Sequence, residues 1–95
     1  MPALLIADVD ITDRVGYDEY LSQLPEMMAA YGGKYLVRGA PAQVLEGSWQ
    51  PRRLAILEFP SMEQLLAFYD SAEYAPVKAG RMNACDANIV VVQTV

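Results

Sequence analysis

The stretch Leu54–Tyr74 constrains the fold of this chain more than any other segment, because each of its parts follows a clear local rule. Residues Leu54–Phe59 are apolar apart from one glutamate and predict a β-strand, which Pro60 ends because proline cannot donate to a sheet. Ser61 and Gln64 have the spacing of a capping box in front of an apolar helical run. The stretch therefore predicts a strand, a stop and a capped helix.

The first half of the chain predicts the same alternation of strand and helix. Residues Ala3–Ile11 alternate as a strand, and an apolar stripe at a spacing of three and four between Tyr17 and Tyr31 predicts an amphipathic helix, kinked or restarted at Pro25. Lys34–Arg38 predicts the next strand, and residues 43–46 predict a short edge strand.

The second half completes the order of elements. Ser71 can cap a short third helix that runs towards Arg81, and the β-branched run Ile89–Val92 predicts a final strand with both faces covered. The order strand, helix, strand, strand, helix, strand is the ferredoxin-like split βαβ arrangement. We therefore expect residues 1–95 to form one α+β domain with a four-stranded antiparallel sheet, helices on one face and an extra short third helix.

In this arrangement the helix-free face of the sheet lacks a cover within one chain. The apolar share of the sequence, 54%, is high for a small domain, which has much surface for its volume. Two such sheets facing each other would bury the apolar residues of this face and form a barrel. We therefore expect a homodimer that covers Leu4, Ile6, Leu36, Leu54 and Ile56.

Composition excludes several classes of function. The net charge is -5 and the basic residues are scattered, which argues against nucleic acid and against an anionic membrane surface as partners. There is no histidine and one cysteine, Cys85, which we read as a small buried hydrophobe. No glycine loop with the spacing of a phosphate site and no spacing of metal ligands is present, so we expect no cofactor and no metal. Lacking a signal or membrane segment, the protein is expected in the cytoplasm.

Several segments resemble one known family in order and spacing. They are Tyr31–Gly39 (YGGKYLVRG), the triplet that starts at Leu45, Glu58–Glu63 (EFPSME), Asp70–Tyr74 (DSAEY) and Arg81. The sequence is similar to the domain of unknown function 1330 family over almost its whole length. This resemblance implies a dimeric α+β barrel related to ferredoxin-like dimers that include small monooxygenases and isomerase-like or lyase-like enzymes. It implies no particular reaction.

Three charged residues are expected on the helix-free face, from the alternation of their strands: Asp8, Arg38 and Glu58. Ionised groups in an apolar space are rarely unpaired, so Arg38 with either carboxylate could be a buried ion pair that fixes strand register. Alternatively, Arg38 binds a ligand while Asp8 or Glu58 acts as the catalytic group that moves a proton. Tyr74 and Arg81 are ligand-binding candidates at the mouth of the same pocket.

The sequence is compatible with two functions. The first is a protein that binds a small metabolite, in one version a cofactor-independent enzyme using proton transfer on an anionic or carbonyl-bearing substrate in the barrel cleft. The second is a non-catalytic dimeric binding or assembly domain whose buried ion pairs are structural. Whether the protein is an enzyme is left undecided by the sequence.

Overall fold

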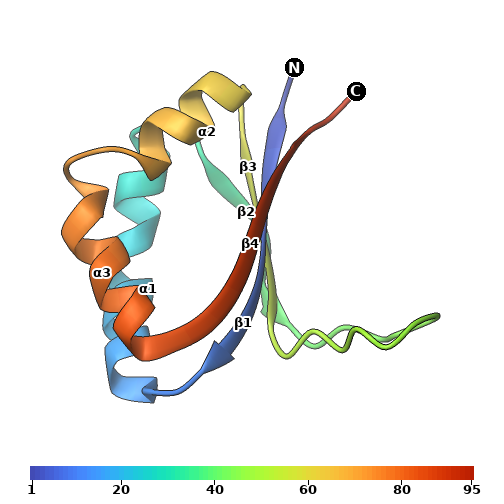
Figure 1. The fold of residues 1–95 in the computed structure, drawn as a ribbon. Helices are drawn as coiled ribbons and strands as arrows, with labels where there is room; N and C mark the ends of the chain where they lie inside the picture. The colour runs from blue at the N-terminus through green and yellow to red at the C-terminus, as the bar shows by residue number, and fades with distance from the viewer.

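The computed structural model describes all 95 residues and contains one sheet covered on one side by helices (Figure 1). The sheet is antiparallel throughout with strand order β2-β3-β1-β4. This confirms the predicted α+β, ferredoxin-like order with an additional third helix. No helix has the length and apolar composition needed to span a bilayer. The elements are β1 (Ala3–Ile11), α1 (Arg14–Ala29), β2 (Lys34–Ala40), β3 (Leu54–Phe59), α2 (Met62–Tyr69), α3 (Tyr74–Ala84) and β4 (Cys85–Gln93).

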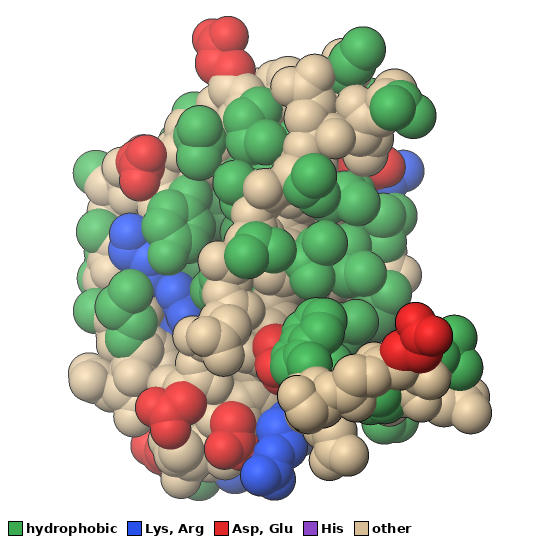
Figure 2. Space-filling view, turned by 45° about the vertical axis from the view of Figure 1, so that its right-hand side comes forward, with side chains coloured by type: hydrophobic (Ala, Val, Ile, Leu, Met, Phe, Trp, Pro, Cys, Tyr) green, Lys and Arg blue, Asp and Glu red, His purple; other side chains and the backbone are tan.

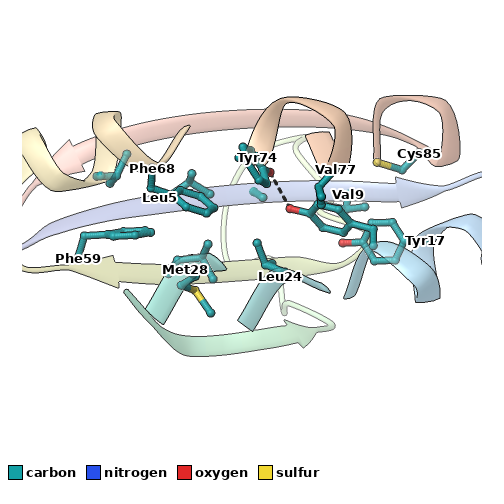
Figure 3. Packing of buried hydrophobic residues seen from close by; sticks show 14 of the residues in the cluster. Leu5, Val9, Tyr17, Leu24, Met28, Phe59, Phe68, Tyr74, Val77 and Cys85 are labelled. Carbon is teal, nitrogen blue, oxygen red and sulfur yellow. Dashed lines mark hydrogen bonds between the residues drawn. The ribbon is translucent and has the colours of Figure 1, made fainter. Parts of the chain in front are cut away.

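The hydrophobic core lies between the sheet and the helices (Figure 3). Strand β1 turns its odd-numbered residues, from Ala3 to Val9, into this core, as expected from period-two alternation. Phe68 of α2 stacks between Phe59 and Tyr74, with ring centroids 5.2 and 4.5 Å away. Cys85 is also buried, which agrees with its reading as a small hydrophobe.

The predicted cap of α2 is present, and α1 has a side-chain cap as well. Asp13 accepts a hydrogen bond from the backbone N–H of Gly16, and the Ser61 hydroxyl accepts one from Gln64 N at 3.1 Å. Helix α1 runs as one element through Pro25, so the predicted restart there is wrong. Packing of its apolar face supports the helix through the position where proline removes one backbone hydrogen bond.

Two strand predictions also need correction. Residues 43–46 form no strand and belong to a long loop, residues 41–53, between β2 and β3. Strand β4 lies at the edge of the sheet, and Val90 and Val92 are exposed, so its expected cover on both faces is not supplied by the chain itself. Hydrophobic β-branched runs therefore do not distinguish a central strand from an edge strand whose cover comes from elsewhere.

A β-bulge in β2 changes which side chains face the helices. Tyr35 pairs with Leu57 and Val37 pairs with Ile56, which leaves Leu36 as an extra residue. Arg38 consequently pairs with Ala55 and lines a pocket on the helix side of the sheet. The expectation that Arg38 shares the helix-free face with Asp8 and Glu58 is therefore wrong, because one inserted residue reverses the alternation after it.

The loop of residues 41–53 projects from the sheet on the side opposite the helices (Figure 1). Asp8 fixes it, since this carboxylate accepts hydrogen bonds from Trp49 Nε1 at 2.8 Å and from Arg52 N at 3.0 Å. Trp49 is 62% exposed and Leu45 87% exposed. The loop thus carries large apolar side chains out on the side of the uncovered sheet.

The helix-free face itself is apolar, and Figure 2 shows hydrophobic side chains gathered over this side of the sheet. The register brings even-numbered residues of three strands next to one another at its centre, with Ile6 between Ile56 and Val90. These side chains are half-buried or exposed in the single chain. A face of this kind is typical of a surface covered by another protein.

Candidate functional site

A narrow pocket lies between the helices and the sheet, with a free volume of about 30 Å³ inside it. Apolar side chains from β1, β3, α1 and α2 form most of its wall, because these elements all turn their apolar faces to the same core. Its polar lining consists of two arginines and five tyrosines, namely Arg38, Arg81, Tyr17, Tyr20, Tyr35, Tyr69 and Tyr74. No carboxylate lines it. The pocket is therefore apolar, and its formal charge is positive.

Arg81 is the most unusual residue of the pocket. It lies in the last turn of α3, is only 5% exposed, and has no hydrogen-bond partner for Nε or Nη2. The two ion pairs of the protein lie elsewhere, and both are at the surface: Arg14 with Asp18, and Lys34 with Glu58. A buried guanidinium without a counterion is costly.

The aromatic groups around Arg81 hold it in a charged state without neutralising it. Its Cζ lies 6.0 Å from the centroid of the Tyr20 ring, within the range of a cation–π contact. Burial lowers the pKa of Arg81, but Tyr74, through its charge and a side-chain hydrogen bond, and then Tyr20 and Tyr69 raise it, so the pKa is raised overall. The guanidinium is thus a permanent cation in an apolar space.

The hydroxyl of Tyr20 donates or accepts a hydrogen bond but does not act as a base at neutral pH. Tyr20 and Tyr74 share a buried hydrogen bond of 2.8 Å, dashed in Figure 3. Burial raises the pKa of Tyr20 far above its usual value, and Tyr74 raises it further. Burial also raises the pKa of Tyr17 and of Tyr35. The pocket therefore offers a cation and neutral hydroxyls, which suits recognition of an anion or a carbonyl oxygen.

These pKa shifts predict a loss of stability at alkaline pH. Below about pH 10 tyrosine is neutral in the folded and in the unfolded protein, so the pKa shifts do not change the free energy of unfolding. Above it, tyrosines of the unfolded chain lose protons that buried Tyr20 keeps, so the free energy of unfolding falls by up to about 1.4 kcal/mol per pH unit and per such group. Urea denaturation from about pH 8 to pH 11 should show this decline. It should be shallower in Tyr20→Phe, and an identical slope in that variant would contradict the assignment.

The site residues proposed from the sequence lie on two different faces of the sheet. Arg38, Tyr74 and Arg81 line the one pocket, although it lies on the helix side of the sheet and not in a barrel interior. Asp8 and Glu58 lie on the opposite face. There Asp8 accepts a hydrogen bond from the loop of residues 41–53, and Glu58 Oε1 lies 3.5 Å from Lys34 Nζ. Within the chain Arg38 forms no ion pair, so the alternative in which it pairs with Asp8 or Glu58 to fix strand register is not found.

Three residues that line the pocket, Tyr17, Tyr20 and Tyr35, were not proposed from the sequence, and neither was Arg53, which lies over the ring of Tyr17. The two tyrosines of α1 stood in an apolar stripe at helical spacing, which is typical of core residues, and they are indeed buried. Arg53 gave no signal, because a basic residue at the end of a polar loop is ordinarily solvated. Across the protein, no three potential metal ligands of the His, Cys, Asp or Glu type come together.

The fold and the pocket define a ferredoxin-like α+β protein with an arginine buried between sheet and helices. The chain belongs to the family described as domain of unknown function (DUF1330), whose model matches residues 2–95. No curated protein matches the sequence.

Solved structures with the same fold differ strongly from this chain in sequence. A protein of unknown function from Rhodopseudomonas palustris is 18% identical with a TM-score of 0.79, over 99% of this chain and 82% of that one. A dimeric ferredoxin-like protein of unknown function from a Jannaschia species is 13% identical with a TM-score of 0.72, over 99% and 100%. SnoaB from Streptomyces nogalater, a cofactor-independent oxygenase, is 6% identical with a TM-score of 0.70, over 99% and 93%. At these identities the likeness concerns the fold alone.

Proposed function

We propose that the protein binds a small anionic metabolite with an apolar body in the pocket between its helices and sheet. The observation that carries this proposal is Arg81, a guanidinium 5% exposed with two nitrogen atoms that have no partner. A carboxylate or enolate oxygen at this position would supply the missing charge and hydrogen bonds. The apolar wall would contact the body of the ligand, which requires the lining side chains to move apart, because the free volume of the pocket in the unliganded chain is about 30 Å³.

A catalytic version of this function uses the same pocket. If the ligand is a carbon acid, Arg81 would stabilise the negative charge of its enolate, a task suited to a fixed cation in an apolar site, but the pocket has no base to accept the proton. The fold likeness to the cofactor-independent oxygenase SnoaB is compatible with such chemistry. However, the pocket contains no carboxylate, so proton transfer by Asp8 or Glu58 would need a substrate on the opposite face. Binding of an anion is therefore the function that the geometry supports best.

Paired ligands that differ only in charge test this function. Phenylacetate and hexanoate should raise the melting temperature, whereas phenylacetamide and hexanamide should not. At a hundredfold excess over the dissociation constant, binding adds about 2.7 kcal/mol to the free energy of unfolding, or roughly 10 °C or more in a domain of this size. The measurement is thermal denaturation followed by circular dichroism.

Matched variants assign the effect to the pocket. Arg81→Met should abolish the shift caused by carboxylates. Glu58→Gln, on the other face of the sheet, and Arg52→Met, on the exposed loop, should keep it. Equal stabilisation by carboxylates and amides, or an unchanged shift in Arg81→Met, would contradict anion binding by Arg81.

We also propose that the helix-free face is covered by a second copy of this chain. The face is apolar, and the loop of residues 41–53 projects on the same side with Leu45 and Trp49 exposed. Proteins of the same fold are described as dimeric, including the one from the Jannaschia species. A twofold pair would bring the same patch of both subunits together, so the apolar centre around Ile6 would meet itself or its neighbours.

A further inference from the structure

A third arginine, Arg53, lies in a groove beside the pocket. Arg38 and Arg53 line this groove, which has a free volume of about 260 Å³ and shares three lining residues with the pocket, namely Leu21, Tyr35 and Arg38. The two hollows are thus neighbours with a common wall. Arg38 lies over the ring of Tyr35, with 5.1 Å between Cζ and the ring centroid. The groove contains no acidic side chain.

The backbone at Arg38 and Gly39 contacts the guanidinium of Arg53 and leaves room for it in the groove. Its Nη2 donates a hydrogen bond of 3.2 Å to the carbonyl oxygen of Arg38, and its Cζ lies 5.4 Å from the centroid of the Tyr17 ring. Its Nε is buried without a partner. Gly39 has φ +112°, and a Cβ there would lie 2.1 Å from Arg53 Nε. Glycine at this position therefore leaves the space that the guanidinium occupies.

Charge balance makes this clustering unusual. The chain has 12 acidic and seven basic residues, so carboxylates are in excess. Even so, none of the three arginines of the pocket and groove forms an ion pair, while Arg14 and Lys34 at the surface do. Adjacent cations without a counterion repel each other, and an anion bound between them removes that repulsion.

Arg81 and the groove lined by Arg38 and Arg53 lie towards opposite edges of the sheet. Arg38 is on edge strand β2, whereas Arg81 also lines a hollow formed with residues of edge strand β4. Three strand spacings of ~4.8 Å put these edges about 14 Å apart. The rings of Tyr17 and Tyr20 lie between Arg53 and Arg81, because Arg53 packs on Tyr17 and Arg81 on Tyr20. The centroids of the two rings are 5.6 Å apart, and the apolar wall of the pocket lies beside them.

Building on the proposed function, we infer that the ligand is a dianion with an apolar spacer. One anionic group binds Arg81 at the buried end, and the second binds in the groove between Arg38 and Arg53. The spacer, an alkyl chain or an aromatic ring system, lies against the apolar wall. The site thereby favours molecules with two separated acidic groups over monocarboxylic acids of the same length.

Calorimetric titration with two matched series tests this inference: linear α,ω-dicarboxylates from succinate to sebacate, and the monocarboxylates of equal chain length. At one best chain length the dicarboxylate should bind about tenfold or more tightly than its monocarboxylate, because it makes an additional charge-assisted contact. Arg53→Met should reduce this preference to near unity. Arg52→Met, the neighbouring exposed cation, should retain the preference.

The possible outcomes separate the two proposals. If both series bind with equal affinity and Arg81→Met abolishes binding, the dianion inference fails and the anion site remains. If a dicarboxylate is preferred equally by wild type and Arg53→Met, the groove is not the second site and the inference also fails. If neither series binds the wild type, both proposals fail. Because Arg53 packs on Tyr17, Arg53→Lys is included; it should fold and keep part of the preference.

Discussion

Replacing Arg81 by methionine is expected to stabilise the unliganded protein. Methionine fills a similar volume with an apolar, adaptable side chain and removes a buried cation whose Nε and Nη2 have no partner. An unsatisfied buried polar group costs about 1–3 kcal/mol. The free energy of unfolding should therefore rise by about that amount, with the melting temperature rising about 4–8 °C for each kcal/mol. Urea and thermal denaturation measure both quantities.

The sign of this change separates a ligand site from a structural role. Arg14→Met, which removes an exposed cation, serves as the control and should change stability by no more than about 0.5 kcal/mol. A fall of 2 kcal/mol or more in Arg81→Met, on the order of what breaking a buried polar network costs, would show that Arg81 serves the core. In the presence of a bound carboxylate the wild type should be more stable than Arg81→Met, since only the wild type gains binding energy.

A negative charge at the centre of the helix-free face is expected to dissociate the dimer. Ile6→Glu removes the burial of an isoleucine, worth roughly 1.5–3 kcal/mol for full burial, and twofold symmetry applies the loss twice. The dimer dissociation constant should therefore rise by about two to four orders of magnitude. Sedimentation velocity on wild type and variant over a concentration series measures this change.

The matched control for this variant carries the same charge on the other side of the molecule. Val15 is 81% exposed on α1, so Val15→Glu should leave the dissociation constant as in the wild type. A wild type that sediments as a monomer at high concentration would remove the basis of the dimer proposal. Equal dissociation constants for wild type and Ile6→Glu would place the interface on another face.

Sequence reasoning succeeded where a local rule acts within one element. Ser61 with Gln64 marked the start of α2, and the alternation of Ala3–Ile11 gave the buried face of β1 correctly. Tyr74 and Arg81, the predicted ligand-binding candidates, line one pocket, but it lies on the helix side of the sheet, and their binding role stays a prediction. Sequence reasoning failed for Arg38, because the bulge at Leu36 depends on how β2 pairs with β3 and has no signature in β2 alone.

The sequence by itself determined the order of strands and helices and the apolar character of both faces of the sheet, since these follow from periodicity, capping residues and proline. Only the tertiary structure decided that Arg38 faces the helices and that Asp8 anchors a loop. It also decided that Arg81 is buried without a counterion. The physical reason is that strand register, loop path and the pairing of charges are set by contacts between residues far apart in the chain.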